Sequence, residues 1–316
     1  MTGFAAADEH IHPVDPDARS WSESWFFSWI DLGGGPAGFF RVGVLPNQGR
    51  AMLWCFVHVD GAWLGVEESR LALDDLDLTD GVAYDRWGLR FGWQPRPPLA
   101  GAHFTFEGTL LGRSGSAAGA HVPVAVDLAC RATAAPVGTG AGDDDGRSAY
   151  ATNRFEQPFA ASGTVVVAGN RRAVQAGAHR DRSWGPREWR QAFTLGDLQG
   201  RDRQLYFVGR SFPGLGGGFV RDGSDAVEQV VAVDGSVEYD DEQRTFASGR
   251  LSFEGPRSTR IEVGLRPVAP SVAFDMAHTC EVPEHWLYWR TLVEAEVSGW
   301  DGPCRGWFET SRYGCA

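Results

Sequence analysis

The densest cluster of polar side chains in the sequence runs from His179 to Trp189 and reads His-Arg-Asp-Arg-Ser-Trp-Gly-Pro-Arg-Glu-Trp. In an extended segment, His179, Asp181 and Ser183 face one way and the residues between them face the other. Residues two apart on a strand are about 6.5 Å apart, which is too far for direct hydrogen bonds, so a Ser-His-Asp triad is not supported. Proton transfer by Asp181 is the chemistry that this segment could carry.

The protonation state of Asp181 separates two interpretations. An apolar wall raises the pKa of a carboxyl group and keeps it protonated as a general acid, whereas the flanking Arg180 and Arg182 pull the pKa down. The alternative is a purely structural Arg–Asp network that pins a tight turn. Which interpretation holds depends on whether the guanidinium groups share the face of Asp181.

The elements that position this cluster are predicted to be β-strands. The 41 Gly and 17 Pro residues separate short segments with period-2 alternation, and turn pairs lie between them at Asp60-Gly61, Gly169-Asn170 and Asp234-Gly235. This pattern predicts an all-β sandwich or barrel. The predicted strands are 21–31, 39–44, 52–59, 84–93, 103–111, 122–132, 163–168, 173–179, 189–195, 204–212, 227–233, 245–253, 260–266, 286–297 and 306–313.

A domain boundary is predicted near the middle of the chain. The stretch 133–152 is rich in Ala, Gly, Asp and Thr and lacks apolar periodicity, as a linker or an exposed loop does. A division there gives domains 1–152 and 153–316, each the size of one eight-to-ten-stranded barrel.

Composition excludes several classes of chemistry. All 29 basic residues are Arg, so Schiff-base chemistry and a P-loop lysine are excluded. The net charge of −12 opposes association with the phosphate backbone of a nucleic acid, so we do not expect nucleic-acid binding. The five Cys lack C-x-x-C spacing and are expected to be reduced thiols. With no apolar run long enough for a membrane span and no recognisable secretory signal, we expect a cytoplasmic protein.

Two further segments are weaker candidates for a site. Asp8-Glu9-His10-Ile11-His12 has H-x-H spacing, but no third His is nearby in the sequence, and we predict no metal site there. Residues 214–218 (Gly-Leu-Gly-Gly-Gly) are predicted to form a flexible loop and not a phosphate cradle, since no helix, Lys or Ser/Thr follows.

The first predicted strand places a carboxylate among aromatic side chains. Its odd positions, Trp21, Glu23, Trp25, Phe27 and Trp29, share one face if the segment is extended. Glu23 is then either a functional group in an apolar pocket or a water-exposed residue at a barrel mouth. The sequence favours neither.

Three segments carry a resemblance to a known family. Residues 181–185 (Asp-Arg-Ser-Trp-Gly) resemble the D-x-x-(W/Y)-G signature of the carotenoid 1,2-hydratase (hydroxyneurosporene synthase) and AttH-like superfamily. Residues 23–27 resemble its E-x-W-(F/Y)-(F/Y/V) strand, and residues 306–313 its G-x-x-E-x-(T/S)-x-Y strand. The fuller R-D-x-S-W-G-x-R-x-W form is closer to an uncharacterised bacterial branch.

The resemblance implies two tandem lipocalin-like (calycin) antiparallel barrels and a general acid at Asp181. In the characterised relatives such an Asp is thought to protonate a carbon–carbon double bond of an isoprenoid. Arg182 and Ser183 depart from the His and Asn of the carotenoid enzymes, so an Arg-rich rim could instead receive a carboxylate- or phosphate-bearing ligand. With this mechanism, His179 is a candidate proton relay, and Glu309 and Glu23 are candidates for a second acid or base. The candidate substrate-binding residues are Trp25, Phe27, Trp184, Trp189, Arg180, Arg187, Trp286 and Tyr313.

The leading hypothesis is therefore a cofactor-independent enzyme, a lyase or isomerase that protonates an olefinic isoprenoid- or polyketide-like substrate. The reaction is expected to be an acid-initiated hydration, dehydration, isomerisation or cyclisation. The rival is a non-catalytic carrier of a hydrophobic small molecule. A scaffold without a ligand, with a filled barrel interior, is the third possibility. The sequence does not indicate an oligomeric state.

Overall fold

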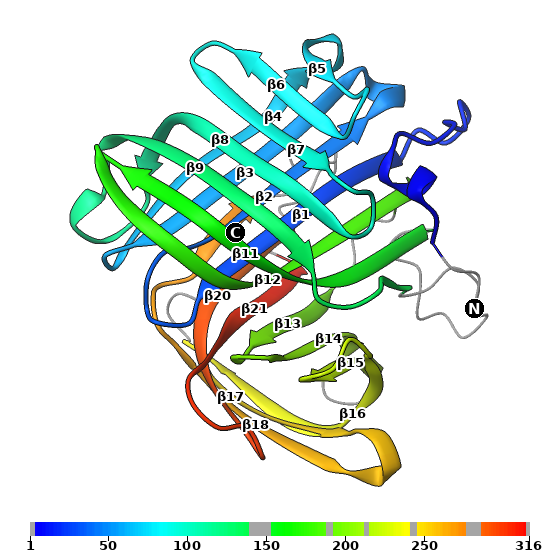
Figure 1. The fold of residues 1–316 in the computed structure, drawn as a ribbon, viewed down its shortest axis with the longest axis vertical. Coiled ribbons are helices and arrows are strands. Elements are labelled where there is room, and N and C mark those ends of the chain that lie inside the picture. The colour runs from blue at the N-terminus through cyan, green and yellow to red at the C-terminus, as the bar shows by residue number, and fades with distance from the viewer. Residues whose placement is uncertain are drawn as a thin grey trace. The chain divides into compact units, whose positions relative to one another are not determined.

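The computed structural model describes residues 4–138, 153–187, 192–211, 215–240, 245–275 and 286–313. The chain divides into two compact units, Met1–Glu188 and Trp189–Ala316. Both units are built from antiparallel strands, so the predicted all-β fold is confirmed (Figure 1). In the described ranges every helix is a short 3-10 turn, and none is long and apolar enough to cross a membrane.

The first unit contains a closed eight-stranded barrel among its described residues. The ring runs β11-β12-β1-β2-β3-β4-β8-β9, and β9 pairs back onto β11. Short strands β5 to β7 extend the wall beside β8, and β10 pairs with β11. The elements are η1 (Ala6–Glu9), β1 (Trp21–Asp31), β2 (Ala37–Leu45), η2 (Pro46–Gln48), β3 (Arg50–Val59), β4 (Ala62–Ala72), η3 (Leu73–Asp75), β5 (Leu76–Asp77), β6 (Val82–Arg86), β7 (Leu89–Pro95), β8 (Gly101–Gly112), η4 (Gly115–Ala117), β9 (His121–Ala132), β10 (Val137–Gly138), β11 (Asn153–Val167) and β12 (Asn170–Pro186).

The second unit also closes a ring of eight described strands, in the order β18-β17-β16-β15-β14-β13-β21-β20. Strand β20 pairs back onto β18, and β19 extends the wall beside β20. The elements are β13 (Phe193–Gln199), β14 (Arg203–Ser211), β15 (Leu215–Asp222), β16 (Glu228–Tyr239), β17 (Phe246–Glu254), η5 (Pro256–Ser258), β18 (Arg260–Pro267), β19 (Val272–Asp275), β20 (Trp286–Val297) and β21 (Cys304–Tyr313). The chain is therefore two tandem antiparallel β-barrels.

Among the described residues, each barrel has a core of buried apolar side chains. In the first, Trp25, Phe27 and Trp29 of β1 belong to a core that also contains aromatic side chains from other strands, including Phe40, Trp93 and Phe104. Phe27 packs 5.0 Å from Trp93 and 5.6 Å from Phe104, between ring centroids. In the second, Phe207, Phe253 and Phe308 belong to a corresponding core. Burial of these aromatic side chains stabilises both barrels.

The predicted domain boundary at residue 152 differs from the observed division at 188. The reason is strand pairing: β11 and β12 lie beyond residue 152, yet they pair with β9 and β1 and complete the first barrel. Part of the predicted linker, residues 139–152, lies outside the described ranges.

Three local predictions were wrong. The predicted strand 84–93 is a hairpin, β6 and β7, joined by a turn with positive φ at Trp87 and Gly88. Asp234-Gly235 lies within β16 and not at a turn. Residues 215–218 belong to strand β15 and not to a loop. There, a Cβ at Gly218 would meet the Tyr206 carbonyl at 1.8 Å, so a close backbone approach requires glycine.

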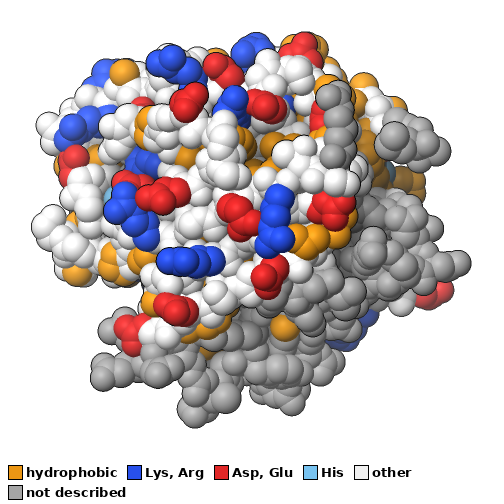
Figure 2. Space-filling model, turned by 90° about the horizontal axis from the view of Figure 1, so that it is seen from below, with side chains coloured by type: hydrophobic (Ala, Val, Ile, Leu, Met, Phe, Trp, Pro, Cys, Tyr) orange, Lys and Arg blue, Asp and Glu red, His pale blue; other side chains and the backbone are white. Residues whose placement is uncertain are grey.

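Charges of both signs are interspersed on the surface. Figure 2 shows arginine and acidic side chains alternating over the described part of one face, with no area of a single sign. Elsewhere in the described ranges, exposed charges form ion pairs such as Arg96–Asp80 and Arg172–Asp60. This face therefore offers no extended basic patch.

Candidate functional site

Strand β12 presents alternate side chains to the two faces of the barrel wall. Val174, Ala176 and Ala178 lie in the core, so the side chains of Arg180, Arg182 and Trp184 continue the inner face. The side chains of His179, Asp181 and Ser183 point to the outer face, where the Ser183 hydroxyl lies 2.8 Å from that of Ser24 on β1. The alternation predicted for this segment is confirmed, and it separates two clusters.

The outer cluster is a chain of charged groups across β11 and β12. Asp181 lies directly opposite Glu156 in the strand pairing. Arg154 bridges the two carboxylates: its Nη2 donates to Asp181 Oδ2 at 3.0 Å and its Nε donates to Glu156 Oε1. The other oxygen of Glu156 lies 2.7 Å from His179 Nε2. Two acids, one guanidinium and one imidazole are thus connected on one face.

The pKa of Asp181 is raised. Burial is the largest cause, because the side chain is only 11% exposed and its charged form loses solvation. The nearby Glu156 carboxylate raises the pKa further, while Arg154, Arg187 and Arg41 lower it without cancelling the effect of burial. The flanking Arg180 and Arg182 point to the other face and are not among these causes. Asp181 therefore holds a proton more readily than an ordinary aspartate does.

An aromatic ring missed by the sequence analysis shares the face of Asp181. Phe26 on β1 pairs directly with Asp181, and beyond it Arg41 on β2 pairs with Phe26. The Arg41 guanidinium lies 4.9 Å from the ring centroid of Trp54 on β3. The row Glu156, Asp181, Phe26, Arg41 and Trp54 therefore crosses five strands. The signal that could have identified Phe26 is its even position in β1, opposite the core residues Trp25 and Phe27.

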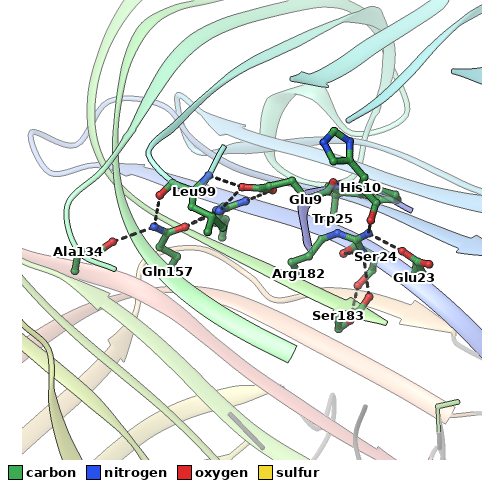
Figure 3. Close-up of polar contacts among 11 residues, drawn as sticks. Glu9, His10, Glu23, Ser24, Trp25, Leu99, Ala134, Gln157, Arg182 and Ser183 are labelled. Carbon is green, nitrogen blue, oxygen red and sulfur yellow. Dashed lines mark hydrogen bonds and ion pairs between the residues drawn. The ribbon is translucent and has the colours of Figure 1, made fainter. Parts of the chain in front are cut away.

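The inner cluster lies at one end of the first barrel, where the segment before β1 folds back against the strands (Figures 1 and 3). Arg180 donates to both carboxylate oxygens of Glu9 at 2.7 Å each. Arg182 donates to Glu23 Oε2 at 2.5 Å and to the His10 carbonyl at 2.6 Å, and its guanidinium lies 3.9 Å from the Trp25 ring centroid. Both ion pairs are fully or almost fully buried.

Glu23 is held in its ionised form. Burial alone would raise its pKa, but hydrogen bonds from His12 and the charge and hydrogen bond of Arg182 outweigh burial and lower the pKa below that of an ordinary glutamate. A carboxylate of this kind is a poor proton donor. Its contacts indicate a structural role in the barrel wall.

The structure does not bring all the predicted site residues together. Trp25, Phe27 and Trp184 point inward, away from Asp181; Trp184 stacks on His12 at 4.0 Å between centroids. Arg187 approaches the Ser183 hydroxyl at 3.5 Å on the outer face. Glu309 belongs to the second barrel, where it forms a buried ion pair with Arg290. Two more predicted residues, Trp286 and Tyr313, pair with each other between β20 and β21 of the second barrel. Trp189 lies outside the described residues.

The H-x-H segment is part of the inner cluster. His12 contacts Glu23, Asp8 and Trp184, and the His10 carbonyl accepts from Arg182. Within the described ranges, no three His, Cys, Asp or Glu side chains are grouped so that they could hold a metal ion.

Comparison with protein families gives a match over residues 5–313 to the family described as "Domain of unknown function (DUF7064)". The chain belongs to the DUF7064 family. Comparison with curated proteins finds no match. The family model covers both barrels, on either side of the division at residue 188.

Two solved structures are similar in fold to the DUF7064 chain. An AttH-like protein from Nitrosomonas europaea has a TM-score of 0.59 at 13% identity, covering 95% of each chain. Kievitone hydratase from Nectria haematococca has a TM-score of 0.55 at 12% identity, covering 95% of this chain and 93% of the hydratase. At these identities the likeness establishes the fold alone: the DUF7064 chain shares its overall fold with these two proteins.

Proposed function

We propose that this protein is an enzyme of the hydratase or cyclase type, in which Asp181 protonates an olefinic isoprenoid- or polyketide-like substrate. The observation that carries the proposal is the setting of Asp181: a largely buried carboxyl group with a raised pKa, opposite Glu156 and beside Phe26 on one face. The resemblance of residues 181–185 to the hydratase signature supports it. So does the shared fold with a protein named kievitone hydratase.

The proposed first step is proton transfer to carbon. The Asp181 O–H bond breaks, a C–H bond forms at one alkene carbon, and the other carbon becomes cationic. Addition of water then gives hydration, loss of a neighbouring proton gives isomerisation, and attack by a second double bond gives cyclisation. The faces of aromatic rings stabilise cations, and Phe26 is the ring placed next to the acid. In this proposal Glu156, which lies opposite Asp181 and is hydrogen-bonded to His179, takes part in returning a proton to Asp181.

In this proposal the substrate contacts the outer face of β12, because the side chain of Asp181 points to that face. The proposal therefore differs from a ligand held inside a hollow barrel. It moves the substrate-contacting role from Trp25, Phe27 and Trp184 to Phe26 and Arg41.

Deuterium labelling tests the proposed reaction. The protein is incubated in D2O with a panel of acyclic isoprenoid alcohols and polyene ketones, and products are analysed by mass spectrometry and NMR. We expect a product with one deuterium on carbon, because the proton on Asp181 exchanges with solvent before transfer. Asp127→Asn, at a 68% exposed carboxylate of the same barrel, is the matched control and should label normally. A product that forms without a C–D bond would rule out the acid step.

A second candidate function, binding of a hydrophobic small molecule without turnover, is favoured by a different observation. A pocket of about 720 Å³ lies beside β4 and the β6–β7 hairpin and is lined in part by Val66, Leu71, Tyr84 and Leu89. Trp87 at the hairpin turn also lines it and is 92% exposed. An aromatic side chain that lines a pocket offers an apolar surface for a ligand to pack against.

For this second function we expect an apolar fluorescent probe such as anilinonaphthalene sulfonate to bind, and Trp87→Ala to weaken its binding about tenfold. Fluorescence titration measures the effect, with Trp21→Ala, on the same barrel, as the control. Equal binding by the Trp87→Ala protein would remove the pocket as a ligand site.

A further inference from the structure

The inner cluster, at one end of the first barrel, surrounds the carboxylate of Glu9 with hydrogen-bond donors. Both oxygens of Glu9 accept from Arg180 at 2.7 Å, and Oε1 also accepts from the Leu99 backbone N–H at 2.9 Å. The Glu9 side chain is fully buried, and the Arg180 side chain is 2% exposed. A guanidinium fork combined with a backbone N–H is a specific arrangement for binding a carboxylate.

The barrel itself positions these donors. Gln157 accepts from Arg180 Nε at 2.9 Å, and its own amide donates to the carbonyls of Leu99 and Ala134 at 2.7 and 3.0 Å (Figure 3). Aromatic rings surround the guanidinium, with the centroids of Phe155 and Phe159 at 4.9 and 5.1 Å from its central carbon. None of these contacts involves Glu9, so the site is organised by strands that are already paired.

The segment that supplies Glu9 belongs to no sheet. Residues 4–20 contain one 3-10 turn and no strand. Its side chains contact the barrel through the carboxylate of Glu9 on Arg180, the ring of Phe4 at 4.9 Å from Phe155, and His12 stacked on Trp184. Its backbone is hydrogen-bonded to Trp25, Arg182 and Glu23. The segment therefore occupies the barrel end in the manner of a ligand.

We propose that this end of the barrel is a binding site for a carboxylate joined to a flat apolar body, and that Glu9 and Phe4 occupy it in the unliganded chain. Arg180 and the Leu99 N–H recognise the carboxylate, and Phe155 and Trp184 recognise the apolar body. A ligand enters by displacing the segment. The site lies on the opposite face of β12 from Asp181, so it does not depend on the proposed reaction.

The test uses the full chain with Phe4→Ala and Glu9→Ala, and phenylacetate as the probe. We expect this double variant to bind phenylacetate at least about tenfold more tightly than the wild type does, because an internal competitor with charge-assisted hydrogen bonds has been removed. Phenylacetamide, which lacks the charge, should show no such gain. Calorimetry measures both. Asp60→Ala, which removes the exposed partner of Arg172, is the matched control and should gain nothing.

Adding Arg180→Gln to the double variant should abolish the gain, and Asp181→Asn should leave it intact. If the double variant does not fold, hydrogen exchange on the wild type decides. Millimolar phenylacetate should accelerate exchange of the Asp8, His10 and His12 amides, which are hydrogen-bonded in this structure, and phenylacetamide should not. Equal binding by double variant and wild type, or unchanged exchange with phenylacetate, would overturn the proposal.

Discussion

The Asp181→Asn protein is expected to lose turnover by about 10²–10⁴-fold, the usual contribution of a positioned general acid. Asn keeps the size of the side chain and can accept a hydrogen bond from Arg154, but it cannot release a proton to carbon. The rate of C–D bond formation in D2O is the measurement. Wild-type rates in this variant would remove Asp181 from the mechanism.

The pH dependence separates this role from a purely structural one. Because the folded chain raises the pKa of Asp181, ionisation of this group costs stability, and that stability is lost as pH rises through the raised pKa. The Asp181→Asn variant lacks this loss. Its melting temperature should therefore rise relative to that of the wild type as pH increases. Glu156→Gln should move the base-side limb of the rate profile to lower pH, since the Glu156 charge raises the pKa of Asp181. A variant that unfolds at every pH would instead favour the structural interpretation.

Breaking the buried Arg182–Glu23 pair should have the largest effect on stability. Both side chains are 0% exposed, and Glu23→Gln removes the carboxylate that is directly bonded to the buried Arg182 charge. We expect a loss of about 3–5 kcal/mol in the free energy of unfolding. Chemical denaturation measures it. The control is Glu107→Gln, which breaks the exposed Arg90–Glu107 pair and should cost at most about 1 kcal/mol.

The sign of the pH effect is opposite to that at Asp181. The depressed pKa of Glu23 means that its stabilisation is present above the ordinary pKa of a glutamate and is lost as pH falls through the depressed value. The gap between wild type and Glu23→Gln should therefore be constant at neutral pH and narrow in acid. Replacing both partners with Met should recover much of the loss, because no unpaired charge remains. A gap that widens in acid would contradict this assignment.

Much of the fold could be predicted from the sequence, because successive side chains of a strand point to opposite faces and so give an alternating sequence pattern. The segment 21–31 was predicted with the bounds that β1 has, and the opposite orientations of Asp181 and Arg182 followed from the period of two. The absence of Lys excluded Schiff-base and P-loop chemistry, and the scarcity of long helical patterns favoured an all-β fold. These are local properties, set by backbone geometry and composition.

Long-range pairing could not be predicted in the same way. The domain boundary was misplaced because β12 completes its barrel by pairing with β1, about 150 residues earlier, and no local pattern encodes that contact. Glu9 and Arg180 meet across an even longer stretch of chain. For the same reason the partners of Asp181 on β11, Arg154 and Glu156, were not identified.

By itself, the sequence determined that this protein is built of alternating strands and that Asp181 is its strongest candidate acid. Only the tertiary structure decided which aromatic side chain stands beside that acid. Residues paired across an antiparallel ladder project to the same face, and the register sets Asp181 opposite Phe26. A shift of one residue would have placed Trp25 or Phe27 there instead. Register is set by the packing of whole strands around a filled core, and this is why the chemistry of the site depended on the fold.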